Sequence, residues 1–159
     1  ARSHDLPVVI ARFFNTVGPR QTGRYGMVIP TLMQQALENK DITVYGTGEQ
    51  SRCFNNVSVV INAIDQLLES PDALGQVYNI GSDEQVTINQ LAERIIKISG
   101  SSSKIVHIPY SEAYQEGFED MMVRVPCLEK IRRTIDYQVD KTLDDTLNEV
   151  MADLKTRGE

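Results

Sequence analysis

The sequence predicts a mixed α/β fold, and three observations point to it. The apolar run at residues 8–11, Val-Val-Ile-Ala, has the length and composition of a buried strand. Several later segments carry apolar residues at helical spacing, and short β-rich segments alternate with them. Because this alternation does not continue as a regular strand–helix–strand series, it suits a mixed arrangement of strands and helices.

The first predicted strand, at about residues 8–14, leads into a loop with the composition of a binding site. Its apolar residues fall on both faces, which is typical of a parallel strand covered on both sides. The sequence Asn-Thr-Val-Gly-Pro follows at 15–19. Ligands bind outside the carboxyl ends of strands in open α/β sheets, so a crevice is predicted here. Since the crevice comes so early, we expect the chain to be part of a larger α/β protein.

Periodicity and breaker residues define the next elements. A helix is predicted at about 28–39, a short strand at 42–45 that ends at two glycines, and a second helix at 59–69 that Pro71 stops. Residues 76–80 form a β-rich segment. The apolar face of the first helix comprises Val28, Ile29, Leu32, Met33, Ala36 and Leu37.

Capping signals define the C-terminal part. Thr87 and Gln90 have the spacing of a capping box that begins a helix, and Gly100 ends that helix. A strand is predicted at 104–108, and the polar segment 112–120 is expected to be a mobile loop. Helices at about 128–134 and 143–154 follow, the second capped by Thr142.

Composition excludes several classes of function. A length of 159 residues fits one domain or parts of two, and a net charge of −6 argues against nucleic acid and anionic membranes as partners. Cys53 and Cys127 have neither disulfide nor metal-ligand spacing, so we expect no metal and two thiols in a reducing cytoplasm. The sequence has no signal peptide and no apolar run long enough to span a membrane.

Five motifs occur in the order of a known family. They are residues 11–20, 42–48 (Ile-Thr-Val-Tyr-Gly-Thr-Gly), 51–54 (Ser-Arg-Cys-Phe), 77–81 (Val-Tyr-Asn-Ile-Gly) and 124–126 (Arg-Val-Pro). In this order they resemble the extended short-chain dehydrogenase/reductase superfamily, in particular its NAD-dependent nucleotide-sugar epimerases, dehydratases and decarboxylases. The likeness covers nearly the whole chain and corresponds to the C-terminal half of the family.

The resemblance implies a fold and an activity. The chain would be the C-terminal part of a Rossmann-type NAD-binding domain plus the smaller mixed α/β substrate-binding domain. Residues of about 1–20 and 55–81 would complete the Rossmann sheet, and about 21–54 and 82–159 would form the substrate-binding domain. In the parent enzyme, NAD would take hydride from the sugar C4 and return it. The family's dinucleotide fingerprint and catalytic residues lie in its other half, so this chain alone is expected to be inactive.

The resemblance also assigns the polar residues that would bind the substrate. Asn15 would contact the nucleotide-sugar, although an Asx-turn that merely leaves the strand is the alternative. Arg52 and Arg124 would bind the diphosphate, because a guanidinium forks onto two phosphate oxygens. For an arbitrary arginine, a solvated surface charge would be the expected role.

The remaining assignments concern the base and the cofactor. Val44 and Tyr45 match the family's shelf for uracil or thymine, and Val28 at a helix N-terminus would close the same pocket. An ordinary half-buried strand is the alternative for residues 44 and 45. Thr16 would lie by the nicotinamide end of NAD, and Arg24 would reach the NAD side.

One motif imitates the superfamily's catalytic pair. Tyr137 and Lys141 have the Tyr-x-x-x-Lys spacing, but they fall between two predicted helices and late in the chain, so we assign them no catalysis. Two positions depart from the family. Ser58 and Cys127 stand where acids are usual, and their loss is expected to weaken the hydrogen bonds that hold the substrate arginines.

Other functions remain open at this point. The chain could be a non-catalytic module that binds a nucleotide-diphosphate sugar, or an oligomerisation module. A reductase with a non-sugar substrate is a third alternative, against which the paired arginines argue. We expect a homo-oligomer. The sugar, the base and the choice among epimerisation, dehydration and decarboxylation are not specified by the sequence.

Overall fold

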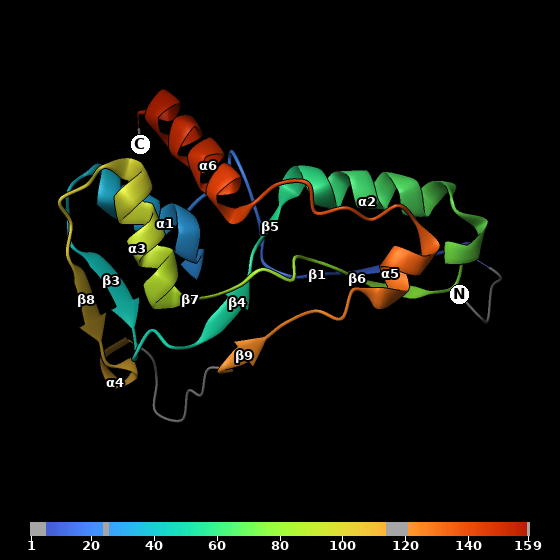
Figure 1. Cartoon of the computed structure of the whole chain (residues 1–159), viewed down its shortest axis with the longest axis horizontal. Helices are drawn as coiled ribbons and strands as arrows, with labels where there is room; N and C mark the ends of the chain where they lie inside the picture. The colour runs from blue at the N-terminus through green and yellow to red at the C-terminus, as the bar shows by residue number, and fades with distance from the viewer. Residues whose placement is uncertain (1–5, 24–25, 114–120, 159) are drawn as a thin grey trace.

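The computed structural model describes residues 6–23, 26–113 and 121–158, whose elements gather in two groups around two hydrophobic clusters (Figure 1). The first group holds two strands, a long helix and two short helical segments. These are β1 (Ile10–Phe13), β6 (Val77–Ile80), α2 (Val57–Glu69), η2 (Pro71–Ala73) and α5 (Glu129–Thr134).

β1 and β6 form a parallel pair in the register Ile10↔Val77 to Phe13↔Ile80. α2 precedes β6 and buries one apolar face in the cluster beside the strands. Pro71 follows its last turn, as predicted. The cluster comprises Val59, Val60, Ala63, Leu67, Ala73, Tyr78, Ile80, Leu128, Ile131 and Tyr137.

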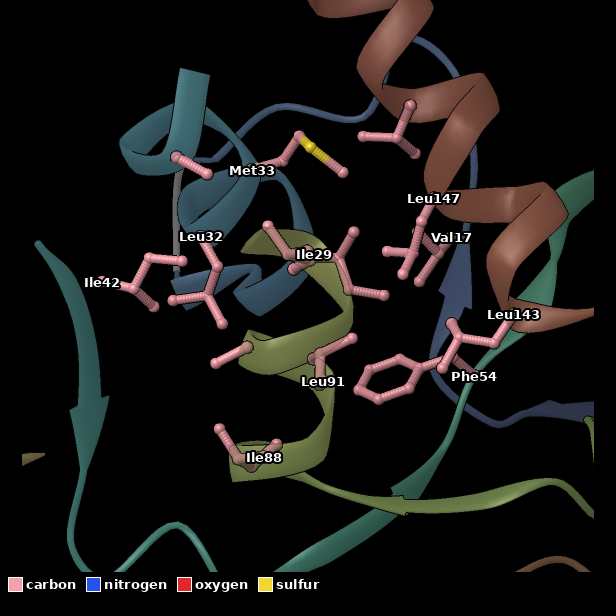
Figure 2. Packing of buried hydrophobic residues seen from close by; sticks show 14 of the residues in the cluster. Val17, Ile29, Leu32, Met33, Ile42, Phe54, Ile88, Leu91, Leu143 and Leu147 are labelled. Atoms are coloured by element: carbon pink, nitrogen blue, oxygen red, sulfur yellow. The ribbon is translucent and has the colours of Figure 1, made fainter. Parts of the chain in front are cut away.

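The second group packs three helices against a parallel strand pair. α1 (Val28–Leu37), α3 (Ile88–Ser99) and α6 (Leu143–Arg157) surround the larger cluster, with β3 (Ile42–Tyr45) and β8 (Ile105–Ile108) beside them. Figure 2 shows their buried side chains pointing toward one another, with Phe54 packed near Leu91 of α3 and Leu143 of α6. The apolar spacing of α1 and α3 therefore serves a single core.

Short strands connect the two groups. β2 (Thr16–Val17) pairs in parallel with β5 (Asn55–Asn56). β4 (Ser51–Cys53) lies between β7 (Gln85–Thr87), which is antiparallel to it, and β9 (Val123–Arg124), which is parallel. These elements have two or three residues each, too few for a period to be visible in the sequence.

The predicted helix signals are confirmed. The Thr87 hydroxyl accepts from the Gln90 amide while the Gln90 side chain accepts from the Thr87 amide, and Gly100 ends α3 with a φ of 67°. Thr142 caps α6 in a second capping box with Asp145. The expected loop at 112–120 is wrong at its start, because α4 (Tyr110–Ala113) covers that position. Residues 114–120 lie outside the described part.

The first strand is only partly covered in the described chain, although its apolar pattern is typical of a strand covered on both sides. Ile10 is 51% exposed and Phe13 is 50% exposed. β6 lies on one edge of β1, and no strand of the described residues pairs with the other edge. An apolar strand is buried only when neighbours cover it, and here one edge and part of one face stay open.

The division of the chain into two domains stays a prediction. The packing adds one observation to it. Leu128, Ile131 and Tyr137 pack in the cluster of β6 and α2, so the segment around α5 joins the first group of elements. Among the described residues, no helix combines the length and the apolar character needed to cross a membrane.

We expect the chain of residues 1–159 to self-associate, because within the described residues β1 has one edge without a strand partner, flanked by exposed apolar side chains. Phe13→Lys should shift the association toward monomer, since a charge on an edge strand opposes edge-to-edge pairing. Val106→Lys, which changes an exposed apolar residue on β8, is the control. Analytical ultracentrifugation measures both, and a compact wild-type monomer at high concentration would contradict the expectation.

Candidate functional site

The candidate site is a cavity of about 450 Å³ between α1, β3 and β4, at the end of β1. This volume falls within the range of small-molecule pockets. The lining residues are Asn15, Gly23, Gly26, Val28, Thr31, Leu32, Thr43, Val44, Tyr45, Gln50, Arg52, Phe54, Ile88 and Tyr110. The cavity therefore brings together Asn15, Val28, Val44, Tyr45 and Arg52, which the sequence analysis selected from four separate segments.

Asn15 turns the chain at the end of β1. Its φ is 36°, in the left-handed region that asparagine tolerates better than most residues. Its Nδ2 donates to the Cys53 carbonyl at 2.8 Å, and its own carbonyl accepts from the Asn55 amide at 3.1 Å. The side chain thus ties β1 to β4 rather than forming a purely local Asx-turn. One amide hydrogen and Oδ1 are not used by these bonds.

β3 presents alternate residues to the core and to the cavity mouth. Val44 is 1% exposed within the larger cluster, whereas Tyr45 is 41% exposed. Gln35 of α1 anchors β3 through the residue before Val44. Its side chain donates to the Thr43 hydroxyl at 2.9 Å and accepts from the Thr43 amide at 3.1 Å. Val28 is the first residue of α1, whose N-cap Met27 makes no side-chain cap.

The structure places Arg52 and Arg124 side by side. They are direct partners in the parallel pairing of β4 with β9, so their Cα atoms are about 5 Å apart and their side chains leave the same face. Arg52 Nη1 donates to the carbonyls of Ser51 at 2.8 Å and Met121 at 2.7 Å. The Arg124 guanidinium lies 5.1 Å from the centre of the Phe14 ring. Arg124 does not line the cavity itself.

This pair concentrates positive charge in an acidic protein. None of the acidic side chains within residues 6–23, 26–113 and 121–158 forms an ion pair with Arg124. Two adjacent guanidinium groups repel each other unless an anion lies between them. The geometry therefore suits a ligand with two negative charges, such as a diphosphate.

Thr16, which is proposed to contact the cofactor, is not among the residues that line this cavity. Thr16 lines a separate hollow of about 450 Å³ together with Gly18, Arg20, Gln21 and Val57. Its Oγ1 is buried and has no hydrogen-bond partner in the described part of the chain, so a ligand group at this position would satisfy it. Arg24 lies outside the described residues. Nowhere in the described chain do three or more potential ligands gather as a metal site.

Sequence reasoning missed several polar residues of the cavity, Gln50 and Tyr110 among them. Gln50 is only 6% exposed, and Tyr110 comes from α4, far along the chain. Gln50 Nε2 donates to the Tyr110 hydroxyl at 2.9 Å. The signal for Gln50 was its position two residues before Arg52, because alternate residues of a strand share a face. No local signal marked Tyr110.

Tyr137 and Lys141 lie on the connector between α5 and α6, as predicted. The Tyr137 hydroxyl is buried, donates to the Gly81 carbonyl at 2.6 Å and accepts from Asn55 Nδ2 at 3.1 Å. Burial raises the pKa of Tyr137, the opposite of what proton transfer near neutral pH requires. Lys141 is hydrogen-bonded to Glu149. The pair is therefore structural.

The two departures from the family have local roles. The Ser58 hydroxyl donates to Asn56 Oδ1 at 2.7 Å at the start of α2. The Cys127 thiol is exposed, and its carbonyl accepts from Asn79 Nδ2 at 3.2 Å. Backbone carbonyls, and not acids at these positions, accept the described hydrogen bonds of Arg52.

The parallel β1–β6 pair with α2, joined to a second α/β group that carries a cavity, defines an α/β protein built on Rossmann-type elements. A family model described as "NAD dependent epimerase/dehydratase family" matches residues 1–81. The chain belongs to this family, whose description makes NAD its cofactor.

Comparison with individual proteins supports this assignment. The chain is 37% identical to UDP-N-acetyl-alpha-D-glucosaminuronate decarboxylase of Bacillus cytotoxicus, over 92% of the chain and 46% of that protein. UDP-glucuronic acid 4-epimerase of Bacillus cereus, solved with UDP-glucuronic acid and NAD, superposes with a TM-score of 0.86 at 28% identity over 98% of the chain and 48% of that structure. Epimerase Mth375 of Methanothermobacter thermautotrophicus, at 22% identity, shares the fold with a TM-score of 0.90 over 99% of the chain and 46% of that structure. The chain spans about half the length of these proteins.

Tyr137→Phe should lower the free energy of unfolding by about 1–3 kcal/mol, because it leaves the Gly81 carbonyl and Asn55 Nδ2 without a buried partner. Turnover of the full-length protein should stay within about twofold of wild type, since a lost proton-transfer group would slow it roughly 10²–10⁴-fold. Denaturant titration and steady-state kinetics measure the two effects. A large rate loss in a folded, NAD-binding variant would overturn the structural assignment.

Acid should destabilise the protein through Glu149. The Lys141 ammonium, with help from Asn56 Nδ2, holds the pKa of Glu149 below its ordinary 4.5. A carboxyl whose pKa is lowered by folding stabilises the folded state above about pH 4.5, and this stabilisation is lost as the pH falls through the folded pKa. Glu149→Gln should therefore flatten the acid limb of a stability–pH curve. Glu93→Gln on α3 is the control, and an equal effect of both variants would refute the assignment.

Proposed function

We propose that the chain forms the nucleotide-sugar-binding part of an NAD-dependent epimerase, dehydratase or decarboxylase. The observation that carries the proposal is the pairing of Arg52 with Arg124 on adjacent strands beside the cavity. A protein that binds a nucleotide-diphosphate sugar needs positively charged groups for the two phosphates and an apolar pocket for the base. The proposal is supported by the apolar side chains that line the cavity and by the arginine pair, one member of which, Arg52, lines it too.

The cavity offers both apolar and charged groups. Val28, Leu32 and Val44 are apolar lining residues, and Tyr45 adds an aromatic one, which would suit a flat base. Arg52 also lines the cavity and is the strand partner of Arg124, and the diphosphate would be bound by this pair. Asn15, at the end of β1, would then hydrogen-bond the phosphate or the sugar with its remaining amide groups.

The cofactor would lie beyond Asn15, on the side of Thr16. When bound, NAD supplies reversible hydride transfer with the sugar. The residues of this chain would bind and orient the substrate for that transfer, with Thr16 as a cofactor contact. We assign no catalytic residue to the chain and propose that it has no activity by itself. In the corresponding domain division, residues of about 1–20 and 55–81 would bind the cofactor, and residues of about 21–54 and 82–159 would bind the substrate.

A second candidate function rests on the open edge of β1. The exposed Ile10 and Phe13 side chains would suit an oligomerisation module, with or without nucleotide-sugar binding. We also propose that the full-length protein is a homo-oligomer in the cytoplasm and that nucleic acids and membranes are not its partners. The net charge of −6 supports the lack of nucleic-acid and anionic-membrane partners in this proposal.

Arg52→Ala and Arg124→Ala should each weaken binding of a UDP-sugar to the full-length protein by about 1.5–3 kcal/mol, the contribution of hydrogen bonds to a charged group. NAD affinity should hardly change. Arg133→Ala, which removes an exposed arginine paired with Glu129, is the matched control. Titration calorimetry with each ligand makes the comparison, and normal UDP-sugar binding by both variants would exclude the diphosphate site.

A further inference from the structure

The Arg124 guanidinium lies over an aromatic ring and not beside a carboxylate. Its Cζ is 5.1 Å from the centre of the Phe14 ring, within the distance of about 6 Å at which the face of a ring attracts a cation. None of the acidic side chains in residues 6–23, 26–113 and 121–158 forms an ion pair with Arg124. Among the described residues, it is therefore a ring and not an acid that stabilises this cation.

The Phe14 side chain is fixed at the end of β1. Its backbone amide donates to the Ile80 carbonyl of β6 at 3.0 Å, and the residue is only 8% exposed. A Cβ at Gly81 would lie 2.9 Å from Phe14 Cβ, so the glycine lets Phe14 pack directly against the backbone that follows β6. The β1–β6 pair thus sets the position of the ring before any ligand binds.

The segment that follows β9 is anchored to the same strand pair. The same Cβ at Gly81 would lie 2.9 Å from Pro126 Cγ, so Pro126 also packs against this position. Asn79 of β6 donates from Nδ2 to the Cys127 carbonyl at 3.2 Å. β9 itself pairs with β4. Arg124 is therefore held at the point where the β1–β6 pair and β4 approach each other.

A ring contact suits an arginine that must bind an anion. A carboxylate beside Arg124 would cancel its charge and occupy N–H groups, and these are the groups that bind phosphate. The face of Phe14 attracts the guanidinium without neutralising it. Arg52 is the strand partner of Arg124, so the ring also offsets part of the repulsion between two like charges.

We propose that Phe14 is a positioning residue that holds the Arg124 guanidinium ready to bind the diphosphate. The inference rests on the proposed nucleotide-diphosphate function. An arginine side chain loses rotational freedom when a ligand fixes it, and this loss opposes binding. Because Phe14 orients Arg124 in the free protein, part of that loss has already occurred before the ligand arrives. Weakening the ring contact should therefore weaken binding of UDP about two- to tenfold.

The test replaces Phe14 in the full-length protein with phenylalanines that carry one, two or three fluorine atoms on the ring. Fluorine withdraws electrons from the face of the ring and leaves its size and shape nearly unchanged, so the packing is retained. Titration calorimetry measures the dissociation constant of UDP. We expect it to rise with each added fluorine and to reach about two- to tenfold the wild-type value.

Two controls separate positioning from packing. The same series in an Arg124→Ala background should give one constant affinity, because the ring then has no guanidinium to hold. The same series at Phe13 should match the wild type. Phe13 precedes Phe14 in the chain, is 50% exposed and has no cation over its ring among the described residues.

The outcomes distinguish the positioning role from the proposed function. If wild-type protein binds UDP and its affinity does not change along the Phe14 series, the positioning role is refuted and the proposed function stands. An equal loss of affinity in the Arg124→Ala background would assign the effect to packing and would overturn the positioning role as well. Failure of the wild-type protein to bind UDP would refute the proposed function, and this inference with it.

Discussion

A chain of hydrogen bonds at the end of β1 holds the two groups of elements together. Asn15 donates to the Cys53 carbonyl and accepts from the Asn55 amide. Asn55 in turn donates to the buried Tyr137 hydroxyl, which donates to the Gly81 carbonyl at the end of β6. These bonds join β1, β5, β6 and the α5–α6 connector at one point. The position of β4, and hence of Arg52, depends on this junction.

The described ion pairs of the protein do not include Arg124. Half of the described arginines and lysines outside the site form ion pairs with described carboxylates, among them Arg94 with Glu84, Arg132 with Asp83 and Lys141 with Glu149. Arg124 instead stacks on Phe14, and the described bonds of Arg52 go to backbone carbonyls. An overall acidic protein can therefore present a local cationic site, because charges that are already paired contribute little to the field of a neighbouring cleft.

The chain matches about half the length of its relatives, and its first strand has an open edge among the described residues. The relatives are about twice as long as this chain, and the chain matches one half of their structures. Within the described part, β1 has a strand on one edge only. Under the proposed function, hydride transfer would also use groups from the part of the relatives that this chain does not match.

The sequence alone determined the elements whose signals are local. Helical periodicity located α1, α2 and α3, and the capping residues Thr87, Gly100 and Thr142 located helix ends, because these signals act within a few residues of the chain. It also selected Asn15, Val44 and Arg52, which motif positions marked. The apolar pattern of residues 8–14 did not by itself specify the exposure of Phe13, because burial of a strand depends on its neighbours. Only the tertiary structure set Arg124 beside Arg52 and Tyr110 against Gln50, since β9 and α4 reach the site through pairings between distant segments that leave no local pattern.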